Sequence, residues 1–525
     1  MRNICGIIAV LSLLIFAQGI CLGSLDQSAT ASAATHAGDP SAPNSTELQG
    51  ILSDFQKYAE KGRVDWNVPG MAVVIVRGND TIYMHAFGVK TLNGTDPVTN
   101  NTIFQIGSTS KAFTAALVAM QVDQGKIGWD DMVIDHLPDF RMYDPWVTRE
   151  FTVTDLMAQR SGLAGYAGDE QSFLGYDRQR IMHSVRYIKP VTSFRSAYAY
   201  QNTMFLWAAA LVENSTGKSW ENNIKERIFQ PLGMNNSTDD MASFQKARDV
   251  ASLHIKLDGK VVALPMDWKY LDWVYIYGPA GGINSNIVDM AKWLRMQMNS
   301  GTFDGKQLIN ESSMSYMHSP KTIIGANPFI PGSNAYYCQG WIFEEYKPSP
   351  VVWHNGGTSG HHTMVAFMPQ EKIGIVVLSN AGYTSLPEAL AFKFFDMYNK
   401  NPERDWSAEY LAGMNETSAQ ANASMPIAPE SPSSALPLAN YTGNYSNEIF
   451  GHISITANSS RLMVTAGPNK MLMTLSHWNR DVFTASVPDF SDQAGFAAFQ
   501  IDPEGRAKSV TMDMFEGATF DRSEK

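Results

Sequence analysis

The segment Ser-Thr-Ser-Lys at residues 108–111 has residue types and a spacing that suit covalent acyl transfer. A serine hydroxyl is a weak nucleophile that needs a proton acceptor, and on a helix a lysine three positions after Ser108 lies on the same face. Residues 104–107 predict a strand, and the apolar run after Lys111 predicts a helix. Ser108 would then lie at a helix N-terminus, where free backbone N–H groups stabilise a developing oxyanion. The alternative is that Ser108 only caps the helix.

The S-x-x-K spacing occurs twice more, at residues 215–218 and 243–246, so the string alone is weak evidence. Residues 215–218 overlap an Asn-Ser-Thr sequon and contain a glycine, and residues 243–246 have no strand before them. Of the three serines, Ser108 alone opens an apolar helix. We therefore take Ser108 as the candidate nucleophile and Lys111 as a candidate base.

Two further strings follow in an order that supports this choice. Tyr200 and Asn202 form Y-x-N after an aromatic-rich run, and His354 and Gly356 form H-x-G before Gly357. A buried tyrosine beside a lysine ammonium can have a lowered pKa and carry protons, and an asparagine amide can hydrogen-bond a substrate amide. Adjacent glycines permit close approach by a ligand, which favours a functional His354 over a structural core histidine.

The order of the three strings resembles the serine β-lactamase and penicillin-binding protein superfamily. The resemblance is to its class C-like branch, which includes D-aminopeptidases, D,D-carboxypeptidases and esterases. Flanking segments extend it over roughly residues 46–400: T-D-L-M-A-Q-R-S-G-L at 154–163, P-A-G-G at 279–282, D-M-A-K-W-L at 289–294 and G-W at 340–341. The joint match is more specific than any single string.

The resemblance implies a two-step acyl transfer. Lys111 and Tyr200 would take the proton of Ser108, and which of them is the base is left open. The N–H groups of the serine and of Gly357 would hold the substrate carbonyl. Asn202 and the histidine of the third string would orient the substrate.

Two residues depart from the pattern of the branch. True class C β-lactamases usually have K-T-G where this chain has His354, and a histidine near its ordinary pKa is only partly charged at neutral pH. Recognition of a substrate carboxylate should therefore be weaker and dependent on pH. Gln159 stands where many relatives have histidine, and we draw no functional conclusion from it.

These observations predict a secreted serine hydrolase that forms an acyl-enzyme on Ser108 with peptide, D-amino-acid amide or ester substrates. The alternatives are a β-lactamase, or a catalytically silent module that binds penicillins or peptides.

Length and composition agree with a secreted two-domain enzyme, whose expected partner is a small-molecule or peptide substrate. The 525 residues include 44% hydrophobic and 17% charged residues, which can supply large cores. A net charge of −11 argues against a nucleic-acid partner. No sequence feature predicts a cofactor or a metal ion: His361 and His362 lack the carboxylate and the spacing of a zinc motif, and we expect them to line the cleft.

The N-terminus reads as an export signal, with Arg2 followed by an apolar run and then small residues. We expect a cleaved signal peptide over residues 1–23 and a secreted or extracytoplasmic protein, with an uncleaved membrane anchor as the alternative. Cys338 is then the lone cysteine of the mature chain, so no internal disulfide can form. Abundant N-x-[ST] sequons indicate a glycoprotein if the host glycosylates asparagine.

The predicted fold class is α/β, an antiparallel sheet flanked by helices with a helical subdomain, followed by a small all-β barrel. Residues 71–76 with 81–87, and 365–368 with 373–378, predict hairpins, and residues 386–398 predict a closing helix. The predicted domains are a β-lactamase-like domain at 46–400, a linker at 401–437 and a lipocalin-like barrel at 438–525. Six alternating segments predict the barrel strands: 452–456, 462–465, 471–475, 482–485, 497–501 and 510–514.

Overall fold

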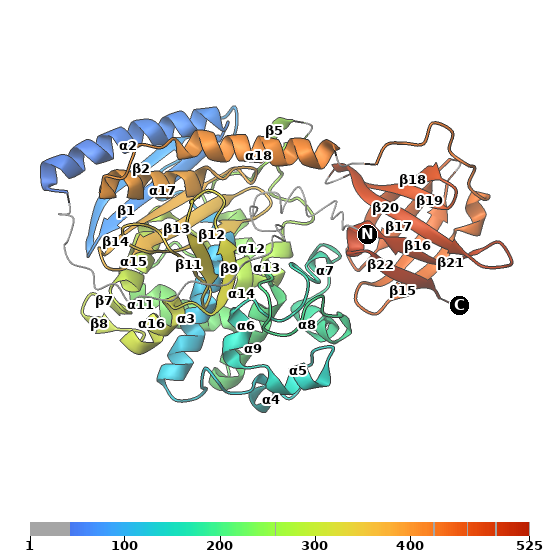
Figure 1. Cartoon of the computed structure of the whole chain (residues 1–525), viewed down its shortest axis with the longest axis horizontal. Helices are drawn as coiled ribbons and strands as arrows, with labels where there is room; N and C mark the ends of the chain where they lie inside the picture. Colours follow the sequence, from blue (N-terminus) through green and yellow to red (C-terminus); the bar gives the residue numbers. More distant parts are fainter. Residues whose placement is uncertain (1–42, 258, 424–425, 459, 489–490, 524–525) are drawn as a thin grey trace.

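A computed structural model of the chain describes residues 43–257, 259–423, 426–458, 460–488 and 491–523. It contains a large N-terminal domain and a smaller barrel beside it (Figure 1). The expected signal peptide lies outside the described residues. Among the described residues, no helix is both long and apolar enough to cross a membrane.

The N-terminal domain is built on one antiparallel sheet of eight strands, in the order β2-β1-β14-β13-β12-β11-β10-β9. Both predicted hairpins are present in it, β1 with β2 and β13 with β14. Pairing of β1 with β14 then joins the start of the domain to its end, with Met71 opposite Ser379. The strands are β1 (Gly70–Arg77), β2 (Asp80–Gly88), β9 (Thr322–Ala326), β10 (Asn334–Tyr337), β11 (Ile342–Glu344), β12 (Val351–Gly357), β13 (His362–Met368) and β14 (Ile373–Ser379).

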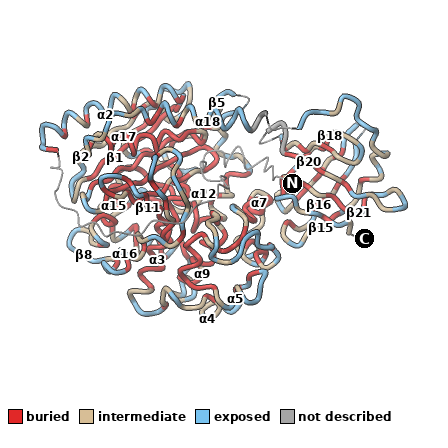
Figure 2. Tube along the Cα trace, in the orientation of Figure 1, coloured by how far each residue is buried: buried red, intermediate tan, exposed pale blue. Residues whose placement is uncertain are grey.

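Helices cover both faces of this sheet, because its central strands are apolar on both sides. On β1, Val73 and Ile75 belong to the core on one face, whereas Val74 and Val76 belong to the core on the other. The first face is covered by α2 (Ser45–Asp65), α17 (Leu386–Asn399) and α18 (Trp406–Ala423). The second is covered by α3 (Ser110–Asp123), α15 (Ile287–Met298) and α16 (Glu311–His318). Figure 2 shows the buried residues concentrated along the sheet and these helices.

A helical subdomain lies beyond α3 and packs on it through α9 (Thr203–Thr216). Its other helices are α4 (Val133–His136), α5 (Pro145–Glu150), α6 (Val153–Met157), α7 (Glu170–Phe173), α8 (Arg178–Ser184), α10 (Trp220–Ile224), α11 (Gln230–Leu232), α12 (Met241–Lys246), α13 (Trp273–Ile276) and α14 (Gly278–Gly281). Short strand pairs join β3 (Phe104–Gln105) to β6 (Asn284–Ser285), β4 (His254–Leu257) to β5 (Lys260–Ala263) and β7 (Thr302–Phe303) to β8 (Lys306–Gln307).

The C-terminal domain is a closed antiparallel barrel, as the fold class predicted. The six predicted segments correspond to β16–β21, and two further strands, β15 and β22, pair with each other to close the barrel. Its strands are β15 (Gly443–Asn447), β16 (Gly451–Ala457), β17 (Leu462–Ala466), β18 (Met471–Asn479), β19 (Val482–Val487), β20 (Ser491–Ile501), β21 (Ala507–Met512) and β22 (Ala518–Arg522).

Helix α18 occupies part of the segment in which the sequence predicted a linker. Its first turn is anchored by aromatic contacts, since the ring of Trp406 stacks on Phe392 of α17 at 5.3 Å between centroids. Tyr410, one turn later, stacks on Phe329 at 4.1 Å. Alanine-rich sequence continues a helix readily once the first turn is fixed, and the next proline along the chain is Pro426.

Candidate active site

Ser108 lies in a tight turn between the sheet and helix α3. Residues Gly107–Thr109 form the short 3₁₀ helix η1, which leads directly into α3. Gly107 has a positive φ of 53°, and a Cβ there would meet Gly357 N at 2.8 Å. This position therefore needs glycine, both for its conformation and for the close approach of β12. The Ser108 side chain is held at the surface of the core, with the residue 8% exposed.

Lys111 is fully buried one turn later, and its amine lies 3.1 Å from Ser108 Oγ. The same nitrogen donates to Asn202 Oδ1 at 2.6 Å and to the carbonyl of Ala280 at 2.9 Å. Burial lowers the pKa of Lys111 well below its ordinary value, and the nearby Asp169 carboxylate only partly offsets this. The structure thus brings the predicted nucleophile and base into hydrogen-bond contact.

Tyr200 lies beside this pair, with Lys111 Nζ 4.6 Å from the centroid of its ring. Burial raises the pKa of Tyr200 well above its ordinary value, the neighbouring Tyr337 and Tyr166 add to this, and the Ser108 hydroxyl offsets part of it. The sequence-based expectation of a lowered tyrosine pKa was therefore wrong in direction, because desolvation outweighs the effect of the lysine. Within the described part of the chain, the Tyr200 hydroxyl has no hydrogen-bond partner of standard geometry. It is a buried hydroxyl that keeps its proton.

His354 is a buried neutral imidazole. Its Nδ1–H donates to the carbonyl of Asn355 at 2.6 Å, so its Nε2 accepts the hydroxyl of Tyr337 at 3.0 Å. Burial, and to a smaller extent the charge of Lys111, lowers the pKa of His354 to about 3 against the opposing effect of the Asn355 carbonyl. The sequence-based expectation of a partly charged histidine that titrates near neutral pH was wrong, because it assumed an exposed side chain.

The end of strand β12 lies against the nucleophile turn. A Cβ on Gly356 would lie 2.0 Å from Ile106 O and 2.9 Å from Ser108 N, so a side chain at this position would clash with the turn. The backbone of Gly357 lies beside Gly107 in the same way. The backbones of Ser108 and Gly357 are thus adjacent, as a two-donor oxyanion site requires.

A buried carboxylate, that of Asp169, lies behind Asn202 and was not predicted from the sequence. Asn202 Nδ2 donates to Asp169 Oδ2 at 2.5 Å, which turns its Oδ1 toward Lys111. Asp169 is buried, and burial raises its pKa to about 7 against the opposing effects of Asn202 and Lys111. Asp169 has no motif spacing that would have singled it out.

Gln159 is clamped against the Y-x-N segment. Its side chain accepts the backbone N–H of Gln201 at 2.6 Å and donates to the Gln201 carbonyl at 3.2 Å. These two bonds fix the backbone between Tyr200 and Asn202. The P-A-G-G segment also contributes to the site. Its Ala280 carbonyl accepts a hydrogen bond from Lys111 Nζ, a contact that the sequence pattern did not predict.

The other candidates lie elsewhere or have structural partners. Ser215 donates to the Val212 carbonyl within α9, and Ser243 forms the N-terminal turn of α12 with Asp240. His362 pairs with Glu388 at 2.7 Å, and His361 accepts the N–H of Gln105. Among the residues that the structure describes, no group of three or more His, Cys, Asp or Glu side chains is arranged to hold a metal ion.

The buried Asp169 predicts a pH-dependent stability difference. Its pKa is raised from 3.8 to about 7, so between these values the native state holds a proton that the unfolded chain releases. The contribution of this group to the free energy of unfolding therefore falls as the pH rises from about 4 to about 7. Asp169→Asn keeps an acceptor for Asn202 and removes this dependence. We expect the difference in melting temperature, variant minus wild type, to increase as the pH is raised from about 4.5 to about 7.5. The same difference at both pH values would contradict the raised pKa of Asp169.

Comparison with known proteins gives the family. The family model described as Beta-lactamase matches residues 55–394, and a model described as a domain of unknown function matches residues 428–524. The unguisins hydrolase of Aspergillus campestris is 29% identical over 488 residues, covering 87% of this chain and 88% of that protein. Penicillin-binding protein 4 of Amycolatopsis lactamdurans is 26% identical over 329 residues, covering 62% of this chain and 85% of that protein.

Solved structures agree in fold over both domains. The octameric penicillin-binding protein homologue from Pyrococcus abyssi superposes with a TM-score of 0.58 at 21% identity and covers 89% of this chain and 99% of its own. The family model spans most of the N-terminal domain, including all three motif strings. The chain therefore belongs to the Beta-lactamase family, within the superfamily of serine β-lactamases and penicillin-binding proteins that the motifs predicted.

Proposed function

We propose that this protein is a serine hydrolase that forms an acyl-enzyme on Ser108, with Lys111 as its general base. The observation that carries the proposal is the hydrogen bonding of the Lys111 amine. A neutral amine has two N–H donors and one lone pair, and Asn202 Oδ1 and Ala280 O take the two donors. As an ammonium, Lys111 Nζ donates to Ser108 Oγ at 3.1 Å; in the neutral form that a general base requires, its lone pair is left for the Ser108 hydroxyl.

In the proposed first step, the Ser108 proton passes to Lys111 Nζ as Oγ bonds to the substrate carbonyl carbon. The N–H groups of Ser108 and Gly357 bind the oxyanion. The bond to the leaving group then breaks, and the leaving group takes a proton from the Lys111 ammonium. Tyr200 donates a hydrogen bond to the leaving group, or passes its own proton to the leaving group while it takes the proton of the Lys111 ammonium. Water attacks the acyl-enzyme in the second step, with the same groups acting in reverse.

Two features of the site support a substrate without a carboxylate near the scissile bond. His354 is neutral, so the third motif supplies no cation. The neighbouring wall is aromatic: Tyr166, Tyr198 and Tyr337 surround Tyr200 and His354, with Tyr166 5.3 Å from Tyr200 between ring centroids. Peptide bonds, D-amino-acid amides and esters fit such a site. We add unguisins to these candidate substrates, because a relative that matches 87% of the chain is named an unguisins hydrolase.

A substrate panel tests this proposal directly. It contains a p-nitrophenyl ester, D-amino-acid amides, an unguisin and a chromogenic cephalosporin, each offered to wild type and to Ser108→Ala. We expect wild type to hydrolyse at least one neutral substrate and Ser108→Ala to hydrolyse none. Cephalosporin turnover alone would favour the β-lactamase alternative. Binding without turnover of any member would favour the silent binding module.

The residue at position 354 should set the preference between neutral and anionic substrates. His354→Lys would place a cation in the third motif, so we expect it to raise kcat/KM for the cephalosporin relative to the neutral ester. Because the pKa of His354 is about 3, the wild-type preference should not change between pH 5 and 8. Kinetics of both substrates across this range, with His477→Lys on the barrel as the control, check both statements. Efficient wild-type β-lactamase activity that His354→Lys leaves unchanged would contradict them.

We also propose that the protein is exported and glycosylated. The apolar leader supports export, and sequons in exposed or half-buried positions, such as Asn79 and Asn93, support glycosylation. N-terminal sequencing of the mature protein and its mass before and after deglycosylation test the two statements. A mature protein that begins at Met1 would indicate the uncleaved anchor or no export.

A further inference from the structure

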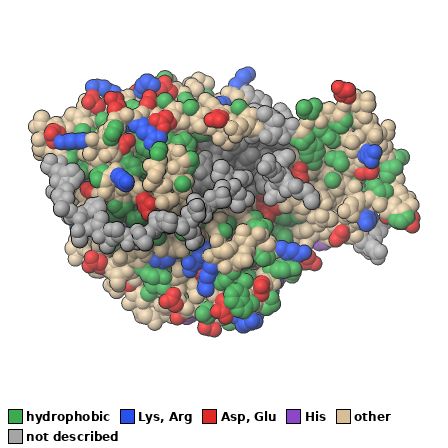
Figure 3. Space-filling view, viewed as in Figure 1, with side chains coloured by type: hydrophobic (Ala, Val, Ile, Leu, Met, Phe, Trp, Pro, Cys, Tyr) green, Lys and Arg blue, Asp and Glu red, His purple; other side chains and the backbone are tan. Residues whose placement is uncertain are grey.

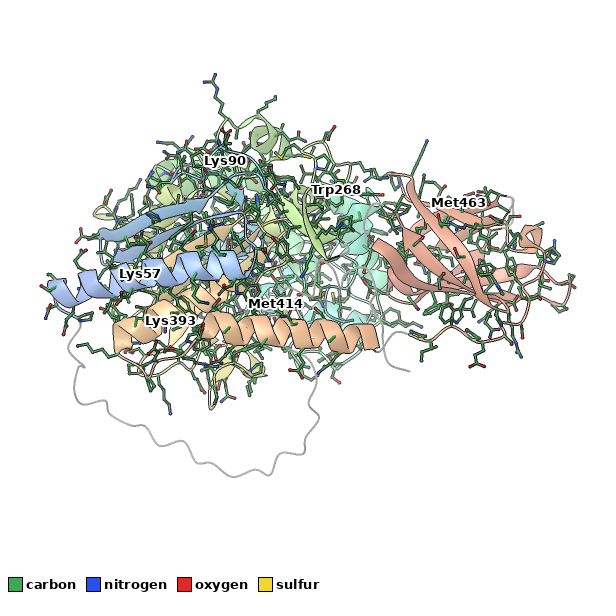
Figure 4. The ribbon with its side chains drawn as sticks, turned by 90° about the horizontal axis from the view of Figure 1, so that it is seen from above. Lys57, Lys90, Trp268, Lys393, Met414 and Met463 are labelled. Atoms are coloured by element: carbon green, nitrogen blue, oxygen red, sulfur yellow. The ribbon has the colours of Figure 1, made fainter. Side chains whose placement is uncertain are left out.

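The barrel packs on the part of the helical subdomain that carries α7 and α8 (Figure 1). The Asn469 N–H donates to the Leu174 carbonyl at 2.9 Å, and Arg180 Nη2 donates to the Glu448 carbonyl at 2.6 Å. Leu174 itself is buried in the hydrophobic core of the barrel. Figure 4 shows Trp268 of the N-terminal domain on the side that faces the barrel. The two domains therefore share a packed interface.

Glu516 reaches the N-terminal domain from the turn between β21 and β22. Met514 and Phe515 of the short helix η5 (Asp513–Phe515) are buried in the barrel core, and Asp513 accepts the N–H of Phe496 at 2.9 Å. Glu516 then has a positive φ of 54°, a conformation that costs energy for a residue with a side chain. In this conformation its Oε1 accepts the backbone N–H of Gly168 at 2.6 Å.

Gly168 directly precedes Asp169, the buried carboxylate behind the active site. Asp169 follows it and binds Asn202 at 2.5 Å, and Asn202 binds Lys111 at 2.6 Å. Glu170 is buried next to them, and burial together with the Glu516 carboxylate raises its pKa well above the ordinary value. A short chain of contacts thus links the barrel to the amine that activates the nucleophile.

We propose that Glu516 of the barrel is a positioning residue of the hydrolase site: by holding the Gly168 N–H it fixes the loop that carries Asp169, and through Asn202 it fixes the Lys111 amine. Lys111 must place its lone pair on the Ser108 hydroxyl, and a displacement of about 1 Å at such a group can cost on the order of 10²-fold in rate. The barrel is then part of the catalytic apparatus and not only an appended domain. This inference rests on the function proposed above.

The test compares Glu516→Ala and Glu516→Gln in the full-length protein. The alanine variant removes the acceptor for Gly168, whereas the glutamine side chain retains an oxygen that can accept the same N–H. Glu504→Ala, in the exposed turn between β20 and β21, is the matched control. Two quantities are measured: the rate at which a fluorophosphonate labels Ser108, and the hydrogen exchange of the peptide that contains Gly168.

We expect Glu516→Ala to slow labelling by about 10-fold or more and to speed exchange at Gly168, with both restored largely by Glu516→Gln. Glu504→Ala should change neither. Unchanged exchange in Glu516→Ala, or faster exchange with an unchanged labelling rate, would overturn the positioning role. No labelling of wild-type Ser108 would refute the proposed function and the positioning role with it, whereas a labelled wild type with an unaffected Glu516→Ala would refute the positioning role alone.

Discussion

Ser108→Ala abolishes covalent labelling by a fluorophosphonate probe and lowers turnover of any accepted substrate by on the order of 10⁴-fold or more. The substitution removes one oxygen atom from a residue that is 8% exposed, so the fold should persist and the thermal midpoint should change little. Labelling followed by mass spectrometry of the modified peptide measures the effect.

The chain supplies its own controls for this experiment. Ser215 and Ser243 also precede a lysine by three residues, yet each has a structural partner outside the site. Ser215→Ala and Ser243→Ala should label like wild type. Labelling that survives in Ser108→Ala and disappears in one of these variants would move the nucleophile.

Lys111→Met should lower the rate of acylation by on the order of 10²-fold or more, the usual scale for a lost general base. Methionine fills most of the buried volume without an amine, and stopped-flow measurement of the acylation burst separates this step from hydrolysis. Tyr200→Phe should cause a loss of the same order, because it removes the hydroxyl that serves the leaving group.

Lys393→Met is the matched control for a buried lysine. Lys393 lies on α17, is 8% exposed and donates to the Arg404 carbonyl at 2.9 Å (Figure 4). It should alter stability without a specific loss of acylation. Near-normal acylation in both Lys111→Met and Tyr200→Phe would refute the proposed mechanism.

The sequence predicted those parts of the site that have a local signature. The serine and lysine one helical turn apart follow from their spacing and from the apolar helix after them, and the glycines at the end of β12 follow from the order of the three strings. Asp169 and Glu516 could not be found this way, because their role depends on which loops the fold brings together. The pKa shifts of Tyr200 and His354 were also beyond the sequence, since they depend on burial that only the packed structure shows.

The same distinction between local patterns and tertiary contacts explains which elements of the fold could be predicted. Hairpins with short turns and the apolar helix α17 were predicted because their patterns are local. Strands β15 and β22 were missed because each has one buried side chain among polar neighbours, and they are fixed by pairing with β16 and β21 and with each other. Helix α18 was missed because its anchor, Trp406 on Phe392, is a tertiary contact.

Charges of both signs are mixed on one face of the molecule. Figure 3 shows Lys and Arg side chains interspersed with Asp and Glu on the face that it displays, with no broad patch of one sign.

The pairing of Met71 with Ser379 sets the order in which activity can arise during synthesis. Strand β1 cannot take its place beside β14 until nearly the whole N-terminal domain has been made, and contacts between such distant segments form slowly. The nucleophile, the Y-x-N segment and strand β12 all lie between these two strands in the chain. A nascent or truncated chain therefore carries the reactive residues without the completed sheet that brings them together.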